Sequence, residues 1–286
     1  MRPSAPSSVP FHAPRPPAAR PTAVQVVLQQ LGPPLVLGAL LALLYAWAQS
    51  GLEPHRRFLM PGWAALWEGA FSSPEVLAEL WRCALETGRI AITGLAISIP
   101  IGMGIGILAF RWRFMERAVF PYLVALQSIP ILAIIPLLQA LLGFGFLPKV
   151  LIVALFTFFA VPTTLLLGLK SLEPGILDLF RLQGASWGVT LLKAGLPSAL
   201  PSLFAGLRIS AGMAVIGAIV SELFFVGGEG GLGQMLINAK LDFQYEQMYA
   251  ALIVSSMMSI GVYLFFSWLG TRLFAHWHPS ADTDSN

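Results

Sequence analysis

The sequence predicts an all-α, polytopic membrane protein with about six transmembrane helices. Of its 286 residues, 56% are hydrophobic and 11% are charged, whereas a typical soluble domain has about 25% charged residues. The mean hydropathy is +0.75. A soluble core cannot absorb this much apolar surface, and the apolar residues gather in long stretches rather than in an alternating pattern. Both observations indicate helices that lie in lipid.

Six apolar segments are long enough, or nearly so, to cross a bilayer. A helix rises about 1.5 Å per residue, so about 20 apolar residues cross roughly 30 Å of hydrocarbon. The predicted spans are residues 33–48, 85–110, 119–142, 147–169, 203–226 and 249–274. We assign all six to a single transmembrane domain, residues 24–278, although the first segment is short.

The two ends of the chain are expected to lie outside that domain. Residues 1–23 are mainly Pro, Ala, Ser and Arg, so they have little to bury and are predicted to be a disordered cytoplasmic tail. Residues 279–286 form a short C-terminal tail. A second interpretation of the N-terminal region stays open, because a basic start, the apolar stretch 35–45 and the sequence Ala-Trp-Ala also fit a cleaved signal peptide.

The placement of Lys and Arg predicts the orientation. Basic residues near span ends are retained on the cytoplasmic side, and the short loop after the second span carries Arg111, Arg113 and Arg117. Both termini and the polar segment 171–201 are therefore expected to be cytoplasmic. Segment 51–81, rich in Pro and Trp, is then an external loop. The net charge of +3 follows this topology and indicates no nucleic-acid surface.

The polar segment 171–201 interrupts the apolar spans for about thirty residues. A Glu-Pro pair at 173–174 predicts a helix start, and Ser186 can cap a second short helix. Gly184 separates the two, and the Gly-Leu-Pro run at 195–197 is expected to end the second. The segment thus predicts two short helices joined at a glycine, kept for an aqueous partner.

This segment resembles the cytoplasmic coupling loop of ABC importer permeases. The family pattern is Glu-Ala-Ala, three residues, Gly, nine residues, Ile, any residue, Leu-Pro. Here a Gly and a Leu-Pro pair match, an Asp-Leu-Phe triplet stands at the Glu-Ala-Ala position, and Ala194 replaces the isoleucine. The resemblance implies that the ATPase-coupling residues are Asp178, Leu179, Phe180, Gly184, Ala185, Leu196 and Pro197.

Further stretches extend the resemblance over roughly residues 85–274. They are QSIPILAIIPLL from Gln127, LFAGLRIS from Leu203 and GGLG from Gly230. They are similar to permeases of the nitrate, sulfonate and taurine type, including relatives for thiamine-precursor pyrimidines. The resemblance implies a type I ABC importer permease fold in the inner membrane and a pore for a small polar organic solute or anion.

The resemblance also implies partners. A chain with six spans supplies half of the usual pore, so a homodimer is expected. Two ATPase subunits would dock on the cytoplasmic loops and one solute-binding protein on the external face. ATP and Mg would be held by the ATPases, and this chain is expected to bind no cofactor. A membrane-embedded enzyme, or a transporter driven by an ion gradient, is the alternative.

The sequence motifs do not favour the alternative of a membrane-embedded enzyme. Residues 228–233 spell G-x-G-x-x-G, but they follow a long apolar helix rather than a strand, so we interpret them as an external glycine-rich turn that lets the fifth and sixth spans pack closely. No P-loop motif occurs. Cys83 is the single cysteine, and only His276 and His278 of the four histidines lie close together. No metal site is therefore predicted.

Polar residues inside the spans are the candidates for the solute pathway. Polar groups in hydrocarbon tend to face the bundle or a water-filled cavity, so we expect Gln127, Ser128 and Glu222 to be pathway or gate residues. The other interpretations are hydrogen bonds between helices or, for Glu222, a solvated interfacial acid. An ionised Glu222 near the external end of its span would need water or a basic partner such as Lys240.

Two further features concern helix packing. Pro130 and Pro136 each remove a backbone donor from the third predicted span and permit a kink. Gly102 and Gly106, spaced four apart in the second span, permit close approach of another helix, in this chain or in a second copy.

Overall fold

The computed structural model describes residues 36, 38–40, 42–47, 50, 51, 53–225 and 230–274. The chain divides into two compact units, Met1–Met60 and Pro61–Asn286, and each is considered by itself. The predicted tails 1–23 and 279–286 lie outside the described residues. Of the predicted span 33–48, residues 36, 38–40 and 42–47 are described, and all of them are helical. The first unit also contains η1, Pro54–Leu59.

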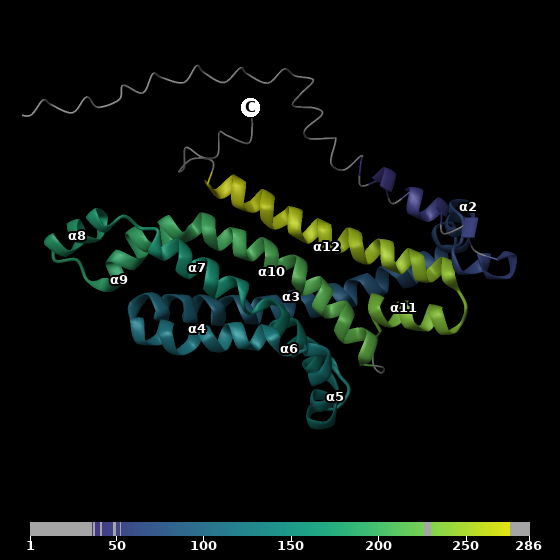
Figure 1. The fold of residues 1–286 in the computed structure, drawn as a ribbon, viewed down its shortest axis with the longest axis horizontal. Helices are drawn as coiled ribbons and strands as arrows, with labels where there is room; N and C mark the ends of the chain where they lie inside the picture. The colour runs from purple at the N-terminus through teal and green to yellow at the C-terminus, as the bar shows by residue number, and fades with distance from the viewer. Residues whose placement is uncertain are drawn as a thin grey trace, which may run out of the picture. The chain divides into compact units, whose positions relative to one another are not determined.

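Every regular element described in the second unit is a helix, which confirms the predicted fold class (Figure 1). In chain order the elements are α2 (Trp63–Leu66), η2 (Trp67–Phe71), α3 (Pro74–Arg111), α4 (Arg113–Ser128), α5 (Ile131–Leu142), α6 (Phe146–Thr157), α7 (Ala160–Lys170), α8 (Pro174–Leu182), α9 (Trp187–Thr190), η3 (Leu191–Gly195), α10 (Leu196–Phe224), α11 (Leu232–Leu241) and α12 (Tyr245–Phe274).

Four helical segments of the described chain are long and apolar enough to cross a membrane, and the bent pair α4–α5 would make a fifth. The four are Pro74–Arg111, Phe146–Lys170, Trp187–Phe224 and Tyr245–Leu273. The expected external loop 51–81 is partly wrong, because α2, η2 and the first turns of α3 are helical. Pro74 in the first turn of α3 fits that position, where its missing N–H needs no partner.

The predicted span 119–142 is wrong as a single straight helix. Its two halves, α4 and α5, are bent by 93° where they meet. The break lies at Ile129, whose backbone is extended with φ −76° and ψ 124°, as a residue before a proline favours. Pro130 therefore interrupts the span, whereas Pro136 lies inside α5 and leaves it continuous.

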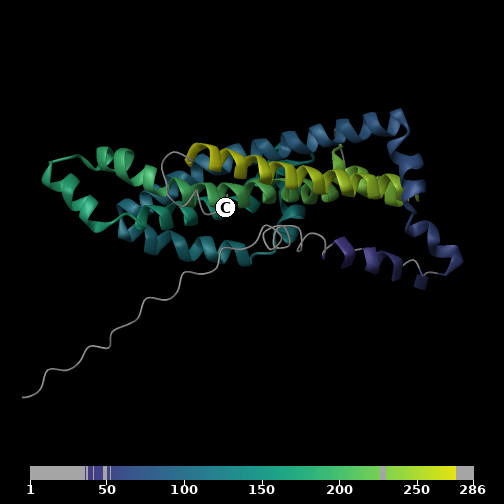
Figure 2. The same cartoon turned by 90° about the horizontal axis from the view of Figure 1, so that it is seen from above.

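Helix α10 lies at the centre of the second unit, where it contacts α3, α6, α7 and α12. Figures 1 and 2 show α12 running alongside it. Buried aliphatic residues fill the space between these helices; among them are Ile90, Leu95, Val153, Leu165, Leu203 and Val215. Two hydrogen bonds cross the same core. The Thr157 hydroxyl donates to Ser98 Oγ over 2.7 Å, and the Ser210 hydroxyl donates to the Thr157 carbonyl over 3.1 Å.

Glycines bring α3 close to α7. A Cβ added at Gly102 would lie 2.9 Å from the Cβ of Val161 and 3.0 Å from Cδ of Pro162. A Cβ at Gly106 would lie 3.1 Å from Cδ2 of Leu165. The neighbour that these two glycines predicted is therefore a helix of the same chain.

Replacing Gly102 with leucine should destabilise the second unit by about 1–3 kcal/mol, because the new side chain overpacks the contact with α7. The matched control is Gly104→Leu, since a Cβ at Gly104 meets nothing within 4 Å. Thermal unfolding of the purified protein in detergent measures both variants. Equal losses of stability in the two variants would show that contact with α7 is not the cause.

Candidate functional site

Residues 171–201, called the coupling loop below, form the two short helices that the sequence predicts. Helix α8 has Glu173 as its N-cap and proline in its first turn. Helix α9 has Ser186 as its N-cap, and the Ser186 side chain accepts a hydrogen bond from the Val189 N–H over 3.4 Å. Figures 1 and 2 both show α8 and α9 projecting beyond one end of α7 and α10.

Gly184 makes the turn between these helices. Its φ is +65°, in the left-handed region. Its N–H donates to the Arg181 carbonyl, and the Ala185 N–H donates to the Phe180 carbonyl, both over 3.0 Å. This pattern is a Schellman C-cap, which satisfies carbonyls at the end of α8. A Cβ at Gly184 would meet nothing within 4 Å. The backbone conformation, rather than crowding, therefore requires glycine here.

The expected helix end at 195–197 is wrong. Leu191–Gly195 forms a π-helical turn, and the chain continues directly into α10 with Pro197 in its first turn. Proline is tolerated there because the first N–H groups of a helix have no partner within it. Leu196 packs into the core between α7 and α10, and Ala194 is buried. Leu196 and Pro197 therefore join the loop to α10 and do not lie beside Leu179 on the exposed surface of α8.

An apolar face is exposed on α8. Leu179, which the sequence singled out, is 52% exposed, whereas Phe180 is only partly exposed. Leu182 is 87% exposed, and Ile176 is exposed too. The residues Ile176, Leu179 and Leu182 are spaced by three and so share one side of the helix; we call them the α8 face. Sequence reasoning missed Ile176 and Leu182, although this spacing in a short helix was the available signal.

Charged residues of α8 are paired with one another. Arg181 Nη1 lies 3.1 Å from Asp178 Oδ1, and both side chains are mostly exposed. An exposed pair of this kind contributes little to stability. Asp178 therefore remains accessible to a partner, one helix position before Leu179.

Gln127 and Ser128 are the last residues of α4, immediately before the break. Both side chains are exposed in the single chain. A helix end leaves backbone carbonyls without helical partners. Within a membrane such groups must be covered by protein or face a water-filled cavity. The α5 half is attached elsewhere, since Gln139 Nε2 donates to the Phe224 carbonyl at the end of α10 over 2.7 Å.

Glu222 lies near the opposite end of α10 from the coupling loop, and its side chain is fully buried. Its Oε2 accepts hydrogen bonds over 2.9 Å from the Thr87 hydroxyl and from the Gly233 N–H. The Thr87 oxygen in turn accepts from the Leu232 N–H over 2.8 Å. This cluster joins α3, α10 and the start of α11. The interpretation as a solvated interfacial acid is therefore wrong, and no ion pair joins Glu222 to Lys240, a possible basic partner, among the described residues.

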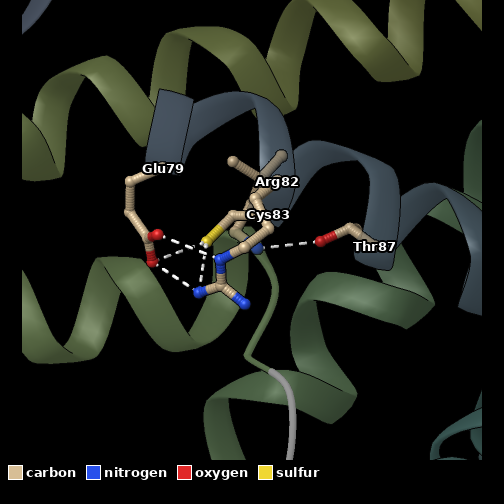
Figure 3. Close-up of polar contacts among 5 residues, drawn as sticks. Glu79, Arg82, Cys83 and Thr87 are labelled. Carbon is tan, nitrogen blue, oxygen red and sulfur yellow. Dashed lines mark hydrogen bonds and ion pairs between the residues drawn. The ribbon is translucent and has the colours of Figure 1, made fainter. Parts of the chain in front are cut away.

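Figure 3 shows Thr87 on α3, together with polar contacts made by Glu79, Arg82 and Cys83 one turn or more earlier. Arg82 Nε donates to Glu79 Oε2 over 3.0 Å. Lys149, at the start of α6 and 3% exposed, attracts the Glu222 carboxylate, whereas Glu86 repels it. The buried carboxylate therefore has hydrogen-bond donors and charges of both signs around it.

The glycine-rich turn packs directly against the cluster of Glu222 and Thr87. Residues 226–229 lie outside the described chain, but a Cβ added at Gly231 would overlap the Glu222 carboxylate and the Thr87 hydroxyl. A Cβ at Gly233 would lie 2.8 Å from Cβ of Glu222. The close contacts at these two positions join the start of α11 to α10 and α3, not the predicted spans 203–226 and 249–274 to each other. The two glycines allow the start of α11 to reach the carboxylate.

Comparisons with known proteins identify the family of this chain. Residues 98–276 match the family model described as "Binding-protein-dependent transport system inner membrane component". A probable ABC transporter permease protein of Haemophilus influenzae is 33% identical over 242 residues, covering 85% of this chain and 96% of that protein. The formylaminopyrimidine transport permease protein ThiX of Halalkalibacterium halodurans is 36% identical over 174 residues, covering 61% and 69%.

A solved structure shares the fold. An inward-facing conformation of the MetNI methionine ABC transporter matches with a TM-score of 0.60 and 21% identity, covering 70% of this chain and 97% of that chain. At this level of identity the likeness concerns the fold alone.

Proposed function

Because this chain belongs to the family of binding-protein-dependent transport system inner membrane components and is a permease subunit of an ABC importer, we propose that two copies form the pore for a small polar organic solute or anion. The solute classes we propose are sulfonate, taurine, nitrate and thiamine-precursor pyrimidine. The similarity to a formylaminopyrimidine permease favours the last of these. An external solute-binding protein would deliver the solute and set most of the specificity.

The α8 face carries the proposal that this chain is driven by a separate ATPase. Leu182 is 87% exposed on a short helix outside the apolar spans. Exposure of this apolar side chain to water is unfavourable, so burial against a partner would lower its free energy. An apolar groove on an ATPase would cover it. Two ATPase subunits would dock on the two loops of the dimer, with Asp178, Leu179 and Phe180 at the contact. ATP and Mg would bind to those subunits, and this chain would hold no cofactor.

The remaining loop residues would give this contact its shape. Gly184 and Ala185 close the turn that sets the angle between α8 and α9. Leu196 and Pro197 connect the loop to α10, so that movement of the loop is passed to a long helix. These are roles in coupling rather than in direct contact with the ATPase.

The exposed break between α4 and α5 is the observation that supports the proposal of a pore. Its exposed polar residues, Gln127 and Ser128, need water or a protein neighbour at membrane depth. A second copy of this chain placed across α4 and α5 would supply the neighbour and enclose a polar path. Glu222, held at the far end of α10, would act near the external gate.

The orientation that we propose places the coupling loop in the cytoplasm, together with both termini. Arg111 lies at the end of α3, and its guanidinium stands 5.5 Å from the ring of Trp187 on α9. Arg113 and Arg117 lie in the first turns of α4, directly after Arg111, so these three basic residues are at the same end as α8 and α9, as expected if that end is cytoplasmic. Residues 24–278 would form the transmembrane domain, with tails at 1–23 and 279–286.

Replacing Leu182 with aspartate should weaken recovery of the ATPase by roughly 1–3 kcal/mol, because it places a charge on a face that becomes buried on docking. The assay is co-purification with the ATPase at limiting concentration. Leu241→Asp is the matched control, since Leu241 is 68% exposed but lies on α11, away from the loop. Equal recovery of the Leu182→Asp and Leu241→Asp proteins would contradict docking through the α8 face.

A further inference from the structure

The end of α3 and the first turn of α4 contact the chain on both sides of α8, at Lys170 and at Trp187. Arg111, the last residue of α3, stacks over Trp187, the first residue of α9, at 5.5 Å from the ring centre. Glu116, in the first turn of α4, accepts a hydrogen bond from Lys170 Nζ over 2.5 Å. Lys170 is the last residue of α7, directly before the loop. Residues 111–116 therefore touch the loop where it leaves α7 and where α9 begins.

The Glu116–Lys170 pair differs from the other ion pairs of the described side chains. Those pairs, Glu79–Arg82, Glu86–Arg89 and Asp178–Arg181, each join residues three apart on one helix. Glu116 and Lys170 instead connect two helices across 54 positions of sequence. The side chains are 30% and 46% exposed. A partly exposed pair adds little to stability, so its effect lies in which helices it links.

The helix that this pair holds is the one that leads to the break. Helix α4 ends at Gln127 and Ser128, and the extended Ile129 follows. Beyond the break, α5 is attached to the end of α10 by the hydrogen bond from Gln139 to the Phe224 carbonyl. The ion pair thus links the start of α4 to α7, and the hydrogen bond links α5 to α10, while α4 also packs on α3 and α5 on α6. The proline-induced break lies between these two polar links.

We propose that the Glu116–Lys170 ion pair, supported by the stacking of Arg111 on Trp187, transmits movement of the coupling loop to the bent pair α4–α5. Glu116 and Lys170 are then positioning residues for transport. When the ATPases move α8 and α9, the end of α7 moves with them, and the ion pair carries the start of α4 along. Gln127 and Ser128, at the other end of α4, change position in consequence. This inference rests on the proposed function, because it requires a loop moved by an ATPase.

The test is a charge exchange in the complex of this chain with its ATPase and binding protein, reconstituted in liposomes. Glu116→Lys and Lys170→Glu should each lower solute uptake on the order of tenfold, within the usual range of coupling between sites. ATP hydrolysis should continue, so the number of solutes moved per ATP falls. The double exchange Glu116→Lys with Lys170→Glu restores the attraction with reversed signs and should recover most of the uptake.

The matched control is Arg117→Glu, which changes the charge of α4 by the same amount as Lys170→Glu changes that of α7. Arg117 is exposed and makes no ion pair with another described residue. Its variant should keep uptake within about twofold of the original protein. Glu116→Gln, which keeps the shape of the side chain, should lower the solute-to-ATP ratio in the same direction. If charge reversal prevents membrane insertion, the Glu116→Gln variant alone tests whether the ion pair is needed for coupling.

The outcomes separate this inference from the proposed function. If the unaltered chain recovers no ATPase, or shows no ATP-dependent uptake of any solute of the proposed classes, the proposed function fails. If the unaltered chain is active but the single variants keep their solute-to-ATP ratio, the link is overturned while the function stands. A double exchange that stays as poor as the single variants also overturns it, because restored attraction would then have no effect.

Discussion

Replacing Glu222 with leucine is expected to destabilise the second unit by about 3–5 kcal/mol, as the removal of one partner from a buried charged cluster does. The carboxylate is fully buried and accepts hydrogen bonds from Thr87 and Gly233. Leucine leaves the Gly233 N–H and the Thr87 hydroxyl without their buried acceptor. The free energy of unfolding in detergent, or the thermal midpoint, measures the loss.

Glu222→Gln is the control that separates hydrogen bonding from charge. Its remaining oxygen can occupy the position of Oε2 and accept from both donors, so the cluster keeps its connections and stability falls less than in Glu222→Leu. Solute uptake should nevertheless change if the charge serves the gate, while recovery of the ATPase stays the same. Thr87→Ser retains the hydroxyl and should behave like the unaltered chain. If the Glu222→Leu protein were as stable as the Glu222→Gln protein, the hydrogen bonds to Glu222 would not stabilise the second unit.

The sequence indicated much of the coupling loop because its signals are local. Pro174 in a first turn, Ser186 as an N-cap and Gly184 between the two helices each act within a few residues, and all three are found as expected. The family spacing was less informative about exposure. It grouped Leu196 with Leu179, although one packs in the core and the other is exposed.

The broken span shows where local signals stop. An isoleucine precedes both Pro130 and Pro136, so the same rule disfavours helix before each of them. The structure separates the two sites by their surroundings. Ile135 is fully buried in a cluster with Ile152 and Phe225, whereas Ile129 is 44% exposed. Tertiary packing holds the helix together at Pro136 and leaves it free to break at Pro130.

The partners of Glu222 were beyond reach for a related reason. Thr87 lies 135 positions earlier in the chain, and the other donor is a backbone group with no side-chain signature. Lys240 was considered because it is near in sequence and opposite in charge. A buried carboxylate is satisfied by whichever donors the fold brings to it, and these come from α3 and the start of α11.

Labelling a cysteine at Ser128 with a charged thiosulfonate reagent should lower solute uptake by about tenfold or more, which adds about 1.4 kcal/mol to the barrier. The expected cause is a bulky charged group in the polar path beside the break. The background is Cys83→Ala, since Cys83 is the single cysteine and is buried. Uptake is measured in liposomes before and after labelling, and mass spectrometry reports how much protein was modified.

Ser256→Cys is the matched control for Ser128→Cys. Ser256 is also an exposed serine, but it lies on α12, most of whose apolar residues are not buried. A cysteine that faces lipid stays uncharged and reacts slowly with a charged reagent, because the thiolate is the reactive form. We therefore expect little labelling and unchanged uptake at position 256. Full labelling at position 128 without loss of uptake, or no labelling there at all, would place Ser128 outside the solute pathway. The path would then have to run elsewhere than beside the break between α4 and α5.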